Sequence, residues 1–528
     1  MDLQERCQQL LQIENIESIP IEEILSISGE LIDLSGDIGC IGGLKKAISW
    51  LESVEKRPLS AGQAATLHYF LANAWANLYT WRDLNTATTD NSDEKLHLKD
   101  EQPWDDNRVS QEIINLRKSI RLGDLEAGYS GILTQAYLNL GNIFSRVGRK
   151  VEAIPYWNKS LQLIPDYGMP LGNRGIGLMA YASTIQPLHD RIELVRQARS
   201  DLARAVDDSK VYPDAKRKFE RSLTFAESFL KDINSDHHTF KYPSTWGESH
   251  DEQGYRKWSA ENGLFLNFLN DIWNDVRVSE DKLLLPDIVT SLDATAIHWF
   301  GLFNQIKQEY ITARFFLFNG MFNKSPKFVQ SRNDLYNTLD YPIYSLDIEE
   351  LKMAFRLAYS LFDKIAFFLN SYLDLGIKPG RVNFRSFWYS GRKSQNRTIR
   401  VKLCAQANWP LRGLYWLRKD LFENDMMNLL EPDAQEFVNI RRHLEHRYLK
   451  VHEYFSFFSG QNYQYDQFFD ELALSILRTD FEQKALRLLK TIRAAIIYLV
   501  MAVFINEQYK KEQQSGIIGP IIVPLLDD

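Results

Sequence analysis

Apolar residues recur along most of this chain at spacings of three and four positions, the period of an α-helix with one buried face. The clearest case is the segment Asp347–Leu375, whose apolar positions are Leu351, Ala354, Phe355, Leu357, Ala358, Leu361, Phe362, Ile365 and Phe368. The 27 glycines and 17 prolines gather in short stretches between such segments, where they end helices. The pattern therefore predicts an all-α fold.

One segment of the chain repeats a known spacing. Between Ala136 and Pro165, small and aromatic residues stand where a tetratricopeptide repeat (TPR) has them: Tyr137, Leu140, Gly141, Phe144, Gly148, Ala153, Trp157 and Ser160. A glycine at 141 lets a first helix approach a second at Ala153, while aromatic rings fill the space around the contact. Gly175 stands thirty-four residues after Gly141. The segment thus resembles the TPR family, and a second, weaker repeat is expected after it.

Further helices are expected to extend this array. His68–Leu78 resembles a first repeat helix and Glu112–Leu122 its partner, separated by a polar stretch from about Asn85 to Ser110 that we interpret as an inserted loop. Isolated repeats cannot bury their own faces. Helices are therefore also expected near Leu44–Val54, Arg191–Val206 and Ala215–Ile233. The prediction is a TPR-like helical repeat array over residues 1–235.

A span rich in helix-breaking residues follows the array, with Pro243, Gly247 and several serines and aspartates between residues 236 and 254. We expect a helical connecting region over 236–345, with helical segments at Tyr255–Trp273 and Thr290–Asn319. Residues 346–528 should form a C-terminal four-helix domain. Its helices are predicted at Asp347–Leu375, Pro410–Phe422, Asp433–Phe455 and Thr479–Gln508.

Composition narrows the classes of function. The net charge of −7 argues against nonspecific DNA binding, which needs a surplus of lysine and arginine. The N-terminus shows no secretory signal, and the longest apolar run, Ala494–Ile505, is too short to span a bilayer and is expected in a buried core helix. The three cysteines, Cys7, Cys40 and Cys404, fit neither a metal site nor a disulfide framework. We expect a cytoplasmic protein without a membrane span, metal or cofactor.

Candidate chemistry lies in the third helix of the predicted bundle, where Arg441 and His446 form the pattern Arg-x4-His. With the surrounding bundle this resembles the HEPN superfamily, in a bacterial branch whose TPR-like repeats precede the HEPN domain. Blocks at Tyr255–Asn267 and Asn408–Leu417 also resemble that branch. The resemblance implies an all-α HEPN-type bundle, a homodimer, and a metal-independent ribonuclease with Arg441 and His446 as catalytic residues. Arg442 departs from the family, which usually has asparagine or another smaller polar residue there.

The same run of residues can instead be a basic, solvated helix face, because Arg-x4-His arises by chance in a chain of this size. A second copy, Arg447 to His452, follows directly. On the predicted helix Asp433–Phe455, one apolar stripe faces the core: Phe437, Ile440, Leu444, Tyr448, Val451 and Phe455. Arg441 lies at the edge of the stripe and His446 on its far side, so one helix cannot by itself aim both at one phosphate. The resemblance to the HEPN superfamily implies a dimer in which a two-fold partner can supply the missing half. His452, close to the stripe, is interpreted as a packed or capping histidine.

Other residues are candidates for supporting roles. Asp363 interrupts the apolar face of the first bundle helix, and either orients an arginine or histidine of the site or pairs with Lys364 or a neighbouring helix. Arg442 can assist Arg441. A basic stretch between bundle helices can hold an RNA backbone or be a solvated loop; it contains Arg392, Lys393, Arg397 and Arg400.

The leading hypothesis is an RNA endonuclease. A histidine can move a proton between the ribose 2′-OH and the leaving 5′-oxygen, and an arginine can stabilise charge on the phosphate, so no metal is required. Family analogy suggests a role in bacterial antiviral defence or toxin-like growth control, in which the repeats sense a trigger or bind a protein or peptide partner. The alternative is a noncatalytic TPR and HEPN scaffold for protein interactions.

Overall fold

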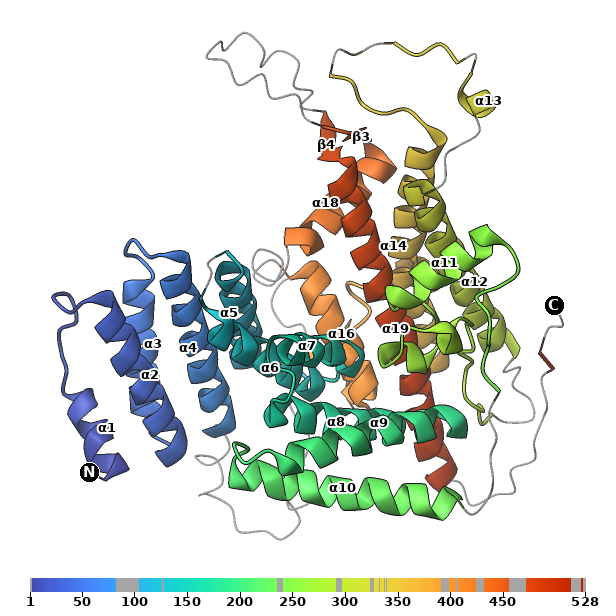
Figure 1. The fold of residues 1–528 in the computed structure, drawn as a ribbon. Helices are drawn as coiled ribbons and strands as arrows, with labels where there is room; N and C mark the ends of the chain where they lie inside the picture. Colours follow the sequence, from blue (N-terminus) through green and yellow to red (C-terminus); the bar gives the residue numbers. More distant parts are fainter. Residues whose placement is uncertain are drawn as a thin grey trace. The chain divides into compact units, whose positions relative to one another are not determined.

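The computed structural model describes residues 2–81, 104–125, 128–234, 241–290, 297–322, 327–331, 333–336, 338, 340–390, 398–404, 407–423, 432–454, 472–513 and 524–525. Most of this chain is helical, as the sequence pattern predicts (Figure 1). The chain divides into two compact units. Unit 1 comprises Met1–Ala180, Val195–Asp232 and Glu423–Pro432, and unit 2 comprises Tyr181–Leu194, Ile233–Phe422 and Asp433–Asp528.

The helices from the N-terminus onward are α1 (Leu3–Leu11), α2 (Ile21–Ile38), α3 (Ile41–Val54), α4 (Ala61–Thr80), α5 (Asn107–Gly123), α6 (Ser130–Arg146), α7 (Lys150–Leu163), α8 (Gly168–Ala182), α9 (Leu188–Asp207) and α10 (Pro213–Asn234). Consecutive helices from α1 to α7 contact one another, and α8, α9 and α10 lie partly in unit 1. The strongest contacts join α2 to α3, α4 to α5 and α6 to α7. Most of the predicted loop from Asn85 to Ser110 lies outside the described residues, but its last residues already belong to α5.

The predicted repeat at Ala136–Pro165 is the helix pair α6 and α7, joined by a turn in which Gly148 has a φ of 90°. Trp157 of α7 is buried and lies directly on Gly141 of α6, where an added Cβ would be 2.6 Å from its indole ring. The indole Nε1 donates a hydrogen bond to Asn142 at 2.9 Å, and the far edge of the ring meets Gly177 of α8. One tryptophan therefore sets the spacing of three helices, although the classification as TPR stays a prediction.

Unit 2 is built around three long helices. In chain order its elements include α11 (His250–Glu261), η3 (Phe268–Asp271), η4 (Val276–Val278), α12 (Ile297–Phe322), α13 (Lys327–Gln330), α14 (Leu346–Tyr372), η5 (Pro379–Arg381), β1 (Tyr389–Ser390), β2 (Thr398–Ile399), α15 (Val401–Cys404), α16 (Trp409–Phe422), α18 (Pro432–His446), β3 (Tyr448–His452), β4 (Ala473–Leu477) and α19 (Arg478–Gln513). Helices α12, α14 and α19 pack against one another, and α16 packs on α19 (Figure 1).

The predicted connecting region, 236–345, thus shares unit 2 with the predicted four-helix domain. Helix α12 packs along α14 as closely as a member of the bundle. The predicted helical segment Tyr255–Trp273 is helical only to Glu261, after which the chain forms an irregular segment with η3. The three domain ranges derived from the sequence stay a prediction.

The predicted third bundle helix, Asp433–Phe455, is too long. Helix α18 ends at His446, and Tyr448–His452 forms β3, which pairs in parallel with β4 in the register Tyr448↔Ala473 to His452↔Leu477. The N–H of Ile343 also donates to the carbonyl of Val451 at 2.7 Å. Apolar residues spaced by three and four positions are typical of a helix. Here the segment forms a strand instead, because it pairs with β4, which lies further along the chain. Tyr448 and Val451 therefore do not extend the helical apolar stripe.

Helix α19 is the central helix of unit 2. The segment Ile492–Val503 is buried along its whole length. By length and composition alone α19 could cross a membrane, but 78% of its most apolar stretch is buried inside the protein. A core helix has this character, in keeping with the buried helix predicted at Ala494–Ile505.

Two arginines are buried beside this helix and are matched by one segment of chain. Arg314 of α12 donates to the carbonyl of Leu264 at 2.9 Å and to both oxygens of Asp281 at 2.9 and 2.6 Å. Arg493 of α19 donates to the carbonyls of Phe265 and Asn267 and, at 2.5 Å, to Asp271. Residues 264–281 therefore connect α12 to α19 through charged hydrogen bonds of two buried arginines.

Two glycines of α6 allow a test of the contact with Trp157. We expect Gly141→Ala to lower the free energy of unfolding by about 1–3 kcal/mol, because the new methyl group displaces the indole. Gly131→Ala on the same helix is the control, because an added Cβ there meets no atom within 4 Å. That variant should be neutral or stabilised by up to about 1 kcal/mol. The measurement is the melting temperature of both variants in thermal unfolding. Equal melting temperatures would contradict the close contact between Gly141 and Trp157.

Candidate active site

Arg441 lies on α18 and turns toward α14. Its Nη2 atom is 3.9 Å from Oδ2 of Asp363, and its Cζ atom is 4.7 Å from the ring centroid of Tyr359. The side chains of Arg441 and Asp363 remain 42% and 41% exposed. Helix α14 thus supports the guanidinium from one side, while part of it faces solvent. An arginine supported in this way retains N–H groups that can bind a phosphate.

The groups that support Arg441 are themselves fixed. Oδ1 of Asp363 accepts the backbone N–H of Phe384 at 2.9 Å, whereas Lys364, an alternative partner, contacts Glu309 of α12. Tyr359 stands one helical turn before Asp363 and is buried, and this burial raises the pKa of its hydroxyl to about 12. It is therefore neutral at physiological pH. Sequence reasoning missed Tyr359, although its position four residues before Asp363 on one helix would have indicated it.

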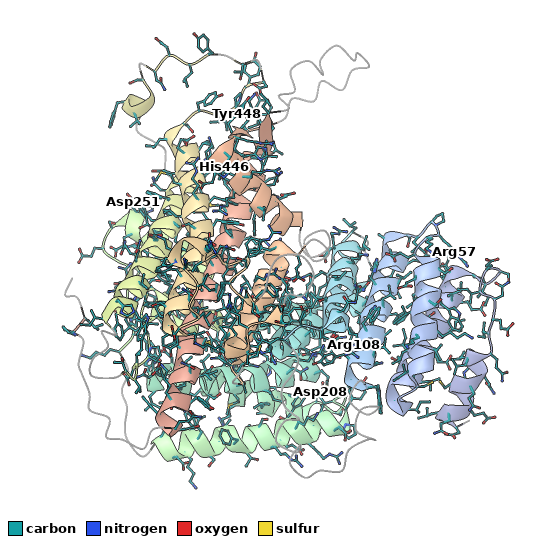
Figure 2. The ribbon with its side chains drawn as sticks, turned by 180° about the vertical axis from the view of Figure 1, so that it is seen from behind. Arg57, Arg108, Asp208, Asp251, His446 and Tyr448 are labelled. Atoms are coloured by element: carbon teal, nitrogen blue, oxygen red, sulfur yellow. The ribbon has the colours of Figure 1, made fainter. Side chains whose placement is uncertain are left out.

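His446 is the last residue of α18 and is exposed to solvent, close to Tyr448 at the start of β3 (Figure 2). Its side chain has no hydrogen bond or ion pair with the described part of the chain. Five helical positions separate it from Arg441, a rotation of about 140° around the helix axis. Within one chain, Arg441 and His446 therefore face different directions.

The end of α18 is held by a second arginine that the sequence did not reveal. Arg356 of α14 donates to the carbonyl of Leu444 at 2.6 Å, so one of the unpaired carbonyls in the last helical turn is satisfied. Arg442 is exposed and donates to Asn439 at 2.6 Å. Arg442 therefore binds within its own helix and does not contact Asp363.

The basic stretch is only partly described. Arg392, Lys393 and Arg397 lie outside the described residues. Arg400 donates through Nε to the carbonyl of Phe387 at 2.8 Å, and its own N–H donates to the carbonyl of Trp388. These bonds close the β1–β2 hairpin, so Arg400 has a structural role in this loop.

The second copy of the motif, Arg447 to His452, is divided between the residue after α18 and the end of β3. His452 is packed, as predicted, although on a strand rather than a helix. Its Nε2 lies 3.3 Å from Oγ of Ser475, and burial lowers its pKa despite the nearby carboxylate of Asp340. Lys450 is also buried and donates to Asp340 at 2.6 Å. In the described part of the chain, no three His, Cys, Asp or Glu side chains are grouped to hold a metal ion.

Comparison with known families identifies a domain that contains these residues. Residues 290–506 match a family model of HEPN domains, and this match supports a HEPN domain in this part of the chain. The matching family is the LA2681-like HEPN. No curated protein and no solved structure was found to match the chain. HEPN domains commonly bind RNA and dimerise, and the superfamily consists generally of ribonucleases. The domain therefore indicates a nuclease or RNA-related function.

The match begins before α12 and ends within α19, so it contains Arg441, Asp363, Tyr359 and His446. It also starts earlier than residue 346, where the sequence analysis placed the start of the HEPN-type bundle. It does not extend to the N-terminal helices.

Burial of His452 predicts a pH-dependent stability. Because its pKa is lowered in the folded protein, the unfolded chain binds the proton more readily, and this histidine destabilises the fold as the pH falls below about 6.5. Between pH 7.5 and 5.5, the melting temperature of His452→Gln should fall less than that of the wild type. His250→Gln, which changes a fully exposed histidine, should follow the wild type. Identical pH dependence in all three proteins would refute this assignment.

Proposed function

We propose that this protein is a metal-independent RNA endonuclease whose catalytic residues are Arg441 and His446. The observation that carries the proposal is the arrangement of Arg441 within a HEPN domain: it is supported by Asp363 and the ring of Tyr359, yet partly exposed. A merely solvated arginine needs neither contact. His446 adds an exposed imidazole at the end of the same helix.

The chemistry follows from the two side-chain types. An imidazole can accept or donate a proton, so His446 can remove the proton from the ribose 2′-OH or donate one to the leaving 5′-oxygen. The 2′-oxygen attacks the adjacent phosphorus while the bond to the 5′-oxygen breaks. Arg441 stabilises the negative charge that builds up on the phosphate. The products are a 2′,3′-cyclic phosphate and a 5′-hydroxyl, and DNA, which lacks the nucleophile, resists cleavage.

Two chains are needed to assemble this site. Since Arg441 and His446 point to different sides of α18, we infer that a two-fold partner places its own α18 opposite the first. In a two-fold interface each contact occurs twice, so a dimer would hold two sites, each with Arg441 of one chain and His446 of the other. Arg442 and the basic stretch with Arg392, Lys393 and Arg397 then assist in holding the RNA backbone.

The N-terminal helices supply the regulation in this proposal. Paired helices of the TPR type form surfaces that bind peptides and proteins, so unit 1 would sense a trigger or a protein partner in the cytoplasm. The biological setting would be antiviral defence or toxin-like growth control, by analogy with the family.

The first prediction for this function is cleavage that needs no metal. Full-length protein incubated with total RNA and a labelled single-stranded oligonucleotide in EDTA should give products with 2′,3′-cyclic phosphate ends. Arg441→Ala and His446→Ala should each lower the rate by at least about 100-fold, the scale of losing a general acid or base or a charge-stabilising group.

His250→Ala is the matched control, because that histidine is fully exposed on α11. It should keep the wild-type rate. Cleavage that EDTA abolishes, or that both site variants retain, would rule out the proposed mechanism. Equal inertness of all four proteins, together with no toxicity of the wild type in cells, would favour a noncatalytic scaffold.

A second prediction separates a shared site from one built within a single chain. Mixing the Arg441→Ala and His446→Ala proteins under conditions that exchange subunits should restore about a quarter of the wild-type rate, because half of the dimers are mixed and each has one intact site. Neither variant should be active alone. If the mixture stays inactive although mass measurements show mixed dimers, both residues of a site come from the same chain.

A further inference from the structure

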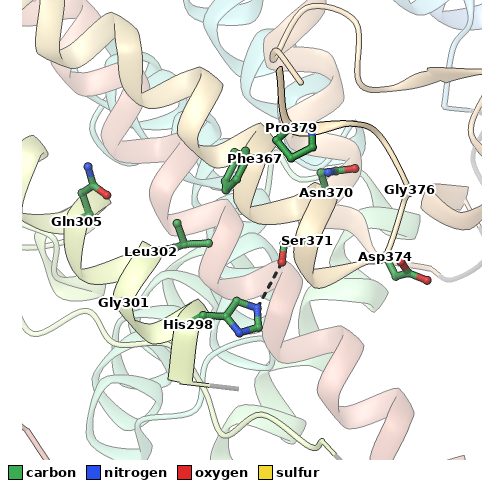
Figure 3. Close-up of a pocket in the computed structure, with 10 residues that line it drawn as sticks. All are labelled: His298, Gly301, Leu302, Gln305, Phe367, Asn370, Ser371, Asp374, Gly376 and Pro379. Carbon is green, nitrogen blue, oxygen red and sulfur yellow. Dashed lines mark hydrogen bonds between the residues drawn. The ribbon is translucent and has the colours of Figure 1, made fainter. Parts of the chain in front are cut away.

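A cleft of about 700 Å³ lies between the first turns of α12 and the last turns of α14, within unit 2 (Figure 3). Helix α12 contributes His298 and Leu302, and helix α14 contributes Phe367 and Ser371. Pro379 of η5 also lines the cleft, close to Phe367 and Asn370 (Figure 3). The cleft belongs to the matched HEPN domain but contains neither Arg441 nor His446.

The wall of the cleft is preformed. The side-chain amide of Asn370 donates to the carbonyl of Ile377 at 2.9 Å and accepts the N–H of the same residue at 3.1 Å. Lys402 donates to the carbonyl of Asp374 at 2.5 Å. These bonds hold residues 374–379 against the end of α14, so a ligand need not order the segment, and its binding is not weakened by that cost.

The interior suits a flat, aromatic ligand with polar edges. Phe367 is 37% exposed, and its ring points into the cleft, facing Leu302 (Figure 3). At the polar end, the hydroxyl of Ser371 lies 3.4 Å from Nε2 of His298 and accepts the indole N–H of Trp299 at 3.1 Å. A nucleobase has both properties, because its faces stack on aromatic rings and its edges form hydrogen bonds.

The cleft continues the face of α14 that carries the candidate site. Asp363, Phe367 and Ser371 are spaced by four residues and lie on one face of the helix. The core-facing residues, among them Phe362, Ile365 and Phe368, lie on the opposite face. Four residues advance about 6 Å along a helix, so Phe367 lies roughly one nucleotide of extended RNA from Asp363 and its partner Arg441.

Charge around the cleft is also suited to RNA. Lys378, Arg381 and Arg385 are exposed on the segment that forms its outer wall, and no acidic residue occurs between residues 375 and 390. The two nearby carboxylates are compensated: Asp374 lies 3.5 Å from Lys402, and Glu309 contacts Lys364. A phosphate backbone passing over this rim meets positive charge.

We propose that this cleft binds one unpaired base of a single-stranded RNA, next to the phosphate that Arg441 contacts, with the base stacked on Phe367. The proposal rests on the proposed function, because it makes the cleft a subsite of the same nuclease. Bases stack on Phe367 regardless of their identity, so the subsite selects unpaired over paired RNA.

The test is binding of full-length protein to a fluorescent oligoribonucleotide with 2′-O-methyl groups, which cannot be cleaved. A series of such oligonucleotides carries one abasic nucleotide at successive positions. The wild type should lose about tenfold in affinity at one position, the scale of one base stacked on an aromatic ring. Phe367→Ala should bind the intact oligonucleotide about tenfold more weakly and lose no further affinity at that position. Phe367→Tyr should restore the wild-type profile.

Phe315→Ala is the control, because it removes a similarly exposed ring from α12 outside the cleft, and it should behave as the wild type. Equal abasic profiles for the wild type and Phe367→Ala would overturn the subsite, while EDTA-resistant cleavage that depends on Arg441 would still uphold the nuclease. A wild type that neither binds nor cleaves single-stranded RNA would overturn both.

Discussion

Two arginine side chains are buried inside unit 2. Each needs hydrogen-bond partners for its charge, and this need fixes the position of the chain segment that supplies them. Arg314 and Arg493 come from α12 and α19, and both are satisfied by carbonyls and carboxylates of residues 264–281. A buried charge that loses its partner costs several kcal/mol, so this segment cannot leave without unfolding its surroundings. Tyr181, which donates to Asp271 at 2.5 Å, ties residues 181–194 to the same cluster.

The position of α14 follows from this constraint. Helix α14 packs on both α12 and α19, which fixes the face that it turns to the core. The opposite face is left to the candidate site, with Asp363 beside Arg441 and Phe367 in the cleft. The support of the arginine and the shape of the cleft are thus two results of one packing arrangement.

Helical periodicity was sufficient to predict the all-α fold and helices such as α14 and α16 to within a few residues. The prediction from periodicity failed where the spacing of apolar residues indicates a helix but pairing with a distant segment makes a strand. Tyr448 to His452 fits a helical stripe, but pairing with residues 473–477 makes it a strand, and this cannot be inferred from neighbours in sequence. The Arg-x4-His motif indicated Arg441 and His446. Asp363 was indicated because it interrupts the apolar face of its helix. The roles of Tyr359 and Arg356 could not be predicted from the sequence, because they depend on the contact between α14 and α18.

The central place of α19 has a consequence for the order in which the chain is synthesised. Arg493 bonds to a residue 228 positions earlier, and Asn408 donates to the carbonyl of Ala502. The helix that completes the core therefore leaves the ribosome after every residue of the candidate site. Until residues 478–513 have emerged, α14 lacks a surface on which it packs, so a growing or prematurely ended chain cannot present a completed HEPN domain.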